Sequence, residues 1–95
     1  MPYLNIVTNQ SVDNEAAFIA TASQTVAKAA SKPESYVMIA LEAKASMSMS
    51  GNDAPAAFLD YRALGLPSDR KAFSDTLCTL INEQLGIAGD RIYIS

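Results

Sequence analysis

The chain has 95 residues, enough for one domain, and a monomer of this size buries only a modest share of its surface. Its net charge of -3 offers no basic surface to nucleic acid, and no apolar stretch is long enough to span a membrane. With no histidine and one cysteine, it excludes an imidazole-based zinc site, a histidine-containing triad and an internal disulfide. We therefore expect neither a metal nor a cofactor. The start of the chain also lacks the pattern of a signal peptide, so we expect a cytoplasmic protein.

The first half of the chain predicts a strand, a helix and a second strand. β-Branched and aromatic residues predict a strand over 3–8. Ser11 is a candidate cap for a helix whose apolar residues recur at helical spacing over 18–30. Pro33 ends that helix. The nearly continuous apolar run over 36–43 predicts a strand that is buried on both faces.

The second half repeats this order. Residues 44–55 predict a loop, and the alternation over 57–64 predicts a strand. Apolar spacing over 73–85 predicts a helix that ends at Gly86, and residues 91–95 begin a last strand.

Two consecutive βαβ units imply parallel strand pairs. Placed side by side, they predict an α/β (α+β) domain over residues 1–95, with one four-stranded mixed sheet and two helices on one face. The run over 36–41 predicts that the bare face of the sheet is apolar. Burial of that face against other copies of the chain is then the simplest arrangement.

Four stretches of the sequence suggest a family. They are Met1-Pro2 leading directly into a strand, SKPESYVM at 31–38, MSMSGNDAP at 47–55, and ALG at 63–65 together with GIAGDRIYIS at 86–95. In order and spacing they resemble the macrophage migration inhibitory factor family of the tautomerase superfamily. The resemblance implies a homotrimer around a central barrel of sheets, and keto–enol tautomerisation of small α-keto acids such as arylpyruvates. It also leaves leaderless secretion open.

Four residues are candidates for the site. Removal of Met1 would expose the secondary amine of Pro2, and burial and a nearby cation would lower its pKa until it serves as general base. The resemblance implies that Lys32 binds the substrate carboxylate, and that Leu64 offers a backbone N–H and a pocket wall. It also implies that Tyr93 enters the pocket of a neighbouring subunit. The alternative roles are structural: a proline that only starts a strand for Pro2, and a solvated cation at a helix end for Lys32. For Leu64 the alternative is a core residue at the end of a strand, and for Tyr93 a packed interface residue.

The sequence also departs from the family pattern. It stops at Ser95, before the short strand and tail that carry pocket aromatics in the family, so we expect weak turnover from a better solvated amine. Met49 replaces a common phenylalanine, and PAAFLD at 55–60 lacks the Cys-x-x-Cys pair of some members, so an oxidoreductase role is not supported. Two alternatives stay open: a cytokine-like binding protein, and a shortened member that is catalytically weak.

The remaining tyrosines and the cysteine have a simpler interpretation. Tyr3, Tyr36, Tyr61 and Cys78 are expected to serve packing rather than chemistry.

Overall fold

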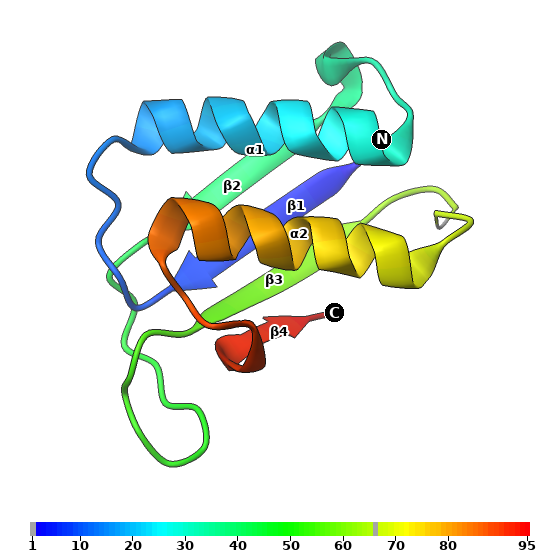
Figure 1. Cartoon of the computed structure of the whole chain (residues 1–95). Coiled ribbons are helices and arrows are strands. Elements are labelled where there is room, and N and C mark those ends of the chain that lie inside the picture. The colour runs from blue at the N-terminus through cyan, green and yellow to red at the C-terminus, as the bar shows by residue number, and fades with distance from the viewer. Residues whose placement is uncertain (1, 66) are drawn as a thin grey trace.

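Two strand–helix–strand units follow one another in the computed structural model, which describes residues 2–65 and 67–95 (Figure 1). The predicted removal of Met1 lies outside the described residues. The elements, in chain order, are β1 (Tyr3–Thr8), α1 (Glu15–Ala30), the 3-10 turn η1 (Glu34–Tyr36), β2 (Met38–Glu42), β3 (Ala57–Arg62), α2 (Arg70–Leu85), the 3-10 turn η2 (Gly89–Arg91) and β4 (Ile92–Ile94). None of the described helices is long and apolar enough to cross a membrane.

The strands form one mixed sheet in the order β2-β1-β3-β4. β1 runs parallel to β2, and β3 runs parallel to β4, as each βαβ unit requires. The two units join through the antiparallel pair of β1 and β3, in which Tyr3 lies opposite Arg62 and Ile6 opposite Leu59. Both helices cover the same face of the sheet (Figure 1), so the predicted fold class is confirmed.

The core lies between the helices and the covered face of the sheet. Alternate residues of the two central strands point into it, and Leu4, Ile6 and Leu59 are completely buried. The helices contribute apolar residues at the spacing that the sequence predicts, among them Phe18, Ala22, Val26, Phe73, Leu77 and Ile81.

The start of α1 differs from the prediction. Asn14, not Ser11, caps the helix, because its side-chain oxygen accepts a hydrogen bond from Ala17 N at 3.0 Å. The end of α2 follows the prediction, since Gly86 takes the left-handed conformation with φ of 69° and donates to Asn82 O at 2.9 Å.

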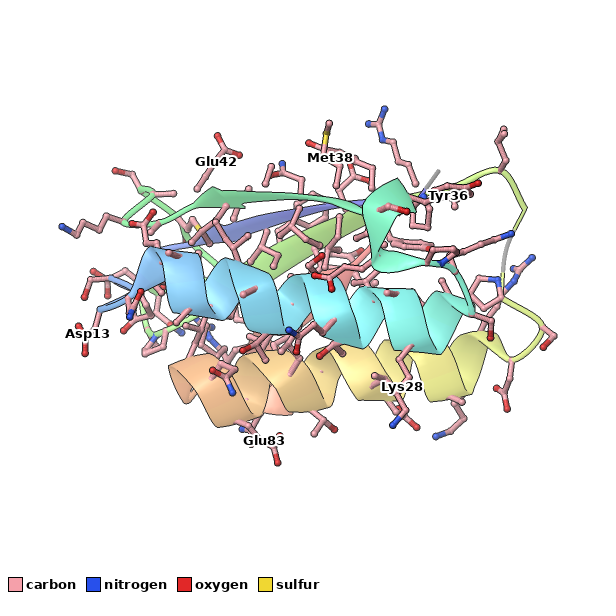
Figure 2. The ribbon with its side chains drawn as sticks, turned by 90° about the horizontal axis from the view of Figure 1, so that it is seen from above. Asp13, Lys28, Tyr36, Met38, Glu42 and Glu83 are labelled. Atoms are coloured by element: carbon pink, nitrogen blue, oxygen red, sulfur yellow. The ribbon has the colours of Figure 1, made fainter. Side chains whose placement is uncertain are left out.

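The second strand is shorter and more exposed than predicted. Tyr36 belongs to η1, where its N–H donates to Pro33 O at 3.0 Å, so β2 begins only at Met38. Ile39 pairs with Leu4 and lies on the covered face, packed against the core. Met38 is 60% exposed and points away from the helices, as Figure 2 shows. The prediction that this strand is buried on both faces is therefore wrong for the single chain.

The bare face of the sheet is mixed rather than wholly apolar, which corrects a second prediction. Asn5 Nδ2 donates to Glu42 Oε2 at 3.3 Å, and Arg62 pairs with Asp60 at 3.1 Å on this face. Apolar side chains such as Tyr93 lie beside these polar pairs. The difference arises because the two central strands, β1 and β3, place Asn5, Asp60 and Arg62 on this face, whereas the prediction considered only the apolar run of β2.

Two side chains hold the loop over 44–55. The guanidinium of Arg91 donates to Met49 O at 2.7 Å, to Ala54 O at 2.8 Å and to Pro55 O at 3.2 Å. From the other side, Asn9 Nδ2 donates to Ala54 O at 3.0 Å. The loop is thus fixed by one residue after β1 and another just before β4.

Candidate active site

A hollow of about 650 Å³ lies between the end of α1 and the start of α2, where β1 begins and β3 ends. Three of the four predicted site residues, Pro2, Lys32 and Leu64, line this hollow. They come from three separate segments of the chain. The antiparallel pairing of β1 with β3 brings the first of these segments next to the last.

Pro2 lies immediately before β1 and is buried. Its carbonyl accepts a hydrogen bond from Met38 N at 2.9 Å, which continues the parallel ladder of β1 and β2. A proline fits the first position of a strand, where it need not donate to the ladder. Its position alternates with Leu4 and Ile6, so its ring shares the covered face of the sheet with the hollow.

Lys32 reaches the hollow because α1 ends just before it. Ser31 takes the left-handed conformation with φ of 55°, and Lys32 N donates to Ala27 O at 3.0 Å across the helix end. Lys32 is exposed and makes no ion pair with the described residues. Its ammonium group is therefore available to an anion.

Leu64 follows the end of β3 and is 93% exposed, the opposite of a core leucine. Gly65 next to it has φ of 85°, a conformation that suits glycine and turns the chain away from the strand. Leu64 therefore forms an apolar part of the rim.

Tyr93 lies apart from the other three candidates. It is on β4 and opposite Phe58, whose ring meets it edge-on with centroids 6.2 Å apart. Tyr93 is 67% exposed on the bare face, whereas the hollow lies on the covered side. It does not join the hollow of its own chain, and its place in the pocket of a neighbouring subunit stays a prediction.

Two further tyrosines, Tyr36 and Tyr61, line the hollow, although the sequence predicts only a packing role for them. The ring of Tyr61 packs against Phe73 of α2, with centroids 4.6 Å apart and an angle of 52° between the rings. Burial raises the pKa of the Tyr61 hydroxyl above its ordinary value, so this group stays neutral at physiological pH. The alternation along β3 places Tyr61 on the same face as Leu59, but its place at the hollow follows only from the strand pairing.

The charges around the hollow are few. Among the described lining residues, Lys32 is the one cation and Asp69 the one carboxylate. Asp69 caps α2, where its Oδ1 accepts from Ala72 N at 3.0 Å. No group of three potential metal ligands occurs within residues 2–65 and 67–95. The arrangement suits an organic anion next to a buried proline.

Comparison with known proteins assigns the chain to a family. The chain matches the family model described as macrophage migration inhibitory factor (MIF) over residues 1–95, and it belongs to this family. A macrophage migration inhibitory factor homolog of Brugia malayi is 35% identical over 97 residues, covering 99% of this chain and 84% of the relative.

Solved structures agree with this assignment. The crystal structure of a homologue from Prochlorococcus marinus has a TM-score of 0.92 and 32% identity, covering 98% of this chain and 84% of that one. The structure of the macrophage migration inhibitory factor from Trichinella spiralis has a TM-score of 0.84 and 30% identity. The match covers 97% of this chain and 84% of that one.

Proposed function

We propose that the protein is an isomerase, a keto–enol tautomerase of α-keto acids such as arylpyruvates, with Pro2 as its general base. The observation that carries this proposal is the meeting of Pro2, Lys32 and Leu64 in one hollow. The neutral amine takes a proton from the carbon next to the carbonyl, which leaves an enolate and a protonated amine. The same proton then returns to the oxygen and forms the enol.

The surroundings of Pro2 favour its neutral form. The residue is buried, and burial disfavours the charged amine. The ammonium of Lys32 lines the same hollow and disfavours a second positive charge there. The same ammonium attracts the carboxylate of an α-keto acid through a charge-assisted hydrogen bond. Leu64 adds an apolar wall to the rim.

We further propose that the chain works as a homotrimer, as the family resemblance implies, and acts in the cytoplasm. The exposed apolar side chains of Met38 and Tyr93 on the bare face support the assembly. The free thiol of Cys78 supports a reducing compartment.

The test replaces the proposed base. Pro2→Gly exchanges the buried secondary amine for a primary amine without the ring, and we expect kcat/KM for phenylpyruvate to fall by about 100-fold or more. Intact-mass spectrometry must show that Met1 is removed from both proteins, and their melting temperatures should agree. Full activity of a protein that retains Met1, or of Pro2→Gly, contradicts the assignment of Pro2 as base.

The pH dependence of the reaction is a second test of the same base. A free α-amino group has a pKa of about 7.7–8.0. Pro2 is buried in this chain, which argues against the better solvated amine expected from the sequence. Because burial and the nearby Lys32 would both lower the pKa of the amine, the rate should rise with pH through a pKa below that range. If the rate instead rises with pH through a pKa at or above that of a free α-amino group, the role assigned to the surroundings of Pro2 is contradicted.

A further inference from the structure

One motif of the sequence has no part in the proposed activity. Asn9-Gln10-Ser11 has the pattern Asn-x-Ser, which is the acceptor of N-linked glycans in proteins that pass through a secretory compartment. No other asparagine of the sequence has serine or threonine two positions later. Since a glycan is bulky and polar, an acceptor that is used in a folded protein has to lie free on the surface.

The side chain of Asn9 is half-buried, and it uses all of its hydrogen-bonding capacity. Its Nδ2 donates to Asp53 O at 3.2 Å and to Ala54 O at 3.0 Å. Its Oδ1 accepts from Ala56 N and from Gln10 Nε2, both at 3.0 Å. Because the N–H of Ala56 can only donate and the two carbonyls can only accept, the orientation of the amide is fixed.

These bonds join the turn after β1 to the end of the loop over 44–55, next to the core (Figure 1). Ala56 is 1% exposed, and its carbonyl accepts from Thr8 Oγ1 at 2.8 Å. Without Asn9, the N–H of Ala56 would lose its acceptor at a place that water hardly reaches, which destabilises the fold. Asn9 is therefore a part of the folded structure and not a free surface group.

Glycosylation alters the atom that makes these contacts. An oligosaccharyltransferase takes the glycan from a lipid diphosphate: the bond from the anomeric carbon to the diphosphate breaks, a bond from that carbon to Nδ2 forms, and one N–H bond loses its proton. In the folded chain, Nδ2 carries two hydrogens and meets two carbonyl oxygens. A carbon in place of a hydrogen would lie well inside the contact distance of a carbonyl oxygen.

We propose that Asn9 is a masked N-glycosylation acceptor, so that the glycan and the folded state exclude one another. The unfolded chain presents an ordinary acceptor, whereas the folded chain commits the amide to residues 53–56. A chain that is modified before it folds is unable to dock the loop over 44–55. The protein therefore reaches its folded state in a compartment without N-glycosylation, and this conclusion does not depend on the proposed activity.

The test sends the full chain into the secretory pathway of a eukaryotic cell behind a cleavable signal peptide. We expect the unmodified sequence to carry a glycan at Asn9, to be retained in the cell and to be sensitive to protease. Ser11→Ala removes the motif and leaves Asn9 in place, since Ser11 is exposed. This variant should be secreted in folded form without a glycan.

A matched control moves the motif to another asparagine. Asn14 caps α1 through its Oδ1, and its Nδ2 has no acceptor among the described residues. Ser11→Ala combined with Ala16→Thr gives Asn14 the acceptor pattern at the exposed start of α1. This double variant should carry a glycan at Asn14 and still be secreted in folded form.

Mass spectrometry of peptides locates the glycan, and resistance to protease reports folding. A secreted, folded protein with a glycan at Asn9 overturns the proposal, and so does an Asn9 that stays unmodified in the retained chain. Retention of Ser11→Ala would mean that the glycan is not what prevents folding. Retention of the double variant would mean that a glycan at any position does so, and either result overturns the role of Asn9.

The contacts of Asn9 are also tested without any glycan. In chains made in a bacterial cytoplasm, Asn9→Ala should lower the melting temperature by about 4–8 °C or more, whereas Ser11→Ala should leave it nearly unchanged. Thermal denaturation followed by circular dichroism measures both. Equal melting temperatures would mean that the amide of Asn9 is dispensable for the fold, and the proposal would be wrong.

Discussion

Lys32 supplies the positive charge among the described residues that line the hollow. In its proposed role, the exposed Lys32 would bind the substrate carboxylate in competition with water, so we expect a contribution near the low end of a charge-assisted hydrogen bond, about 1.5 kcal/mol. This value corresponds to roughly a 13-fold change in affinity.

Lys32→Ala should therefore raise the KM of an arylpyruvate by roughly 10-fold and barely change that of its methyl ester, which has no carboxylate. Lys28→Ala is the matched control, since Lys28 lies one helical turn earlier and points away from the sheet in Figure 2. Equal losses for acid and ester would show that Lys32 does not contact the carboxylate.

The sequence motifs predict Pro2, Lys32 and Leu64 at one site, and these residues do line one hollow. Tyr61 could not be identified in the same way. Its exposure to the hollow depends on where β3 ends and on its contact with Phe73, twelve residues later, and neither is written in a short motif. A residue whose role depends on the strand register needs the register to be known.

Both helices begin with a side-chain cap, and only one of these caps borders the hollow. Asp69 accepts from Ala72 N and lines the hollow, whereas Asn14 accepts from Ala17 N and does not. The two caps have the same geometry, with both hydrogen bonds at 3.0 Å. Substitution of each cap in turn therefore separates an effect on helix stability from an effect on ligand binding.

Asp69→Ala and Asn14→Ala should each destabilise the fold by about 1 kcal/mol, which lowers the melting temperature by several degrees. In addition, Asp69→Ala should change the Kd of cinnamate, which shares the shape of the enol but does not react, because it removes a carboxylate from the hollow and loosens its edge. Thermal denaturation and calorimetry measure the two effects. Equal binding by both variants would mean that the start of α2 does not shape the site.

The helices and strands could largely be predicted from the sequence. The errors concern where α1 and β2 begin, and they have local causes. Ser11, Asp13 and Asn14 are all acceptable caps by residue type, and only the tertiary fold selects Asn14. Tyr36 is apolar enough to extend a strand, yet the hydrogen bond to Pro33 O places it in a 3-10 turn. Boundaries of this kind depend on hydrogen bonds that composition does not specify.

The molecule as a whole has one layer of helices and one uncovered face. In Figure 2, Met38 and Glu42 point from the bare face, and Lys28 and Glu83 lie on the outer side of the helices. The apolar run over 38–41 could not reveal this division, because Ile39 and Leu41 face the core. If the proposed trimer forms, the bare face is the surface for its contacts.

Sedimentation equilibrium should give a trimer at micromolar concentration. Met38→Lys adds a charge on the bare face, at a side chain 60% exposed in the single chain, so it should dissociate the trimer without unfolding the domain. Glu83→Gln makes the same change in net charge on the outer helix face and should leave the trimer intact. A monomer from the unmodified chain would refute the assembly.

The way in which the loop over 44–55 is held has a consequence for the order of folding. The hydrogen bonds from Arg91 to this loop span 36, 37 and 42 residues, and the bond from Asn9 to Ala54 spans 45. Arg91 lies just before β4 and Asn9 just after β1, so these bonds form only when both ends of the sheet are in place. The segment is held by few bonds outside the strand ladders, and its amide hydrogens should exchange with solvent sooner than those of the central strands.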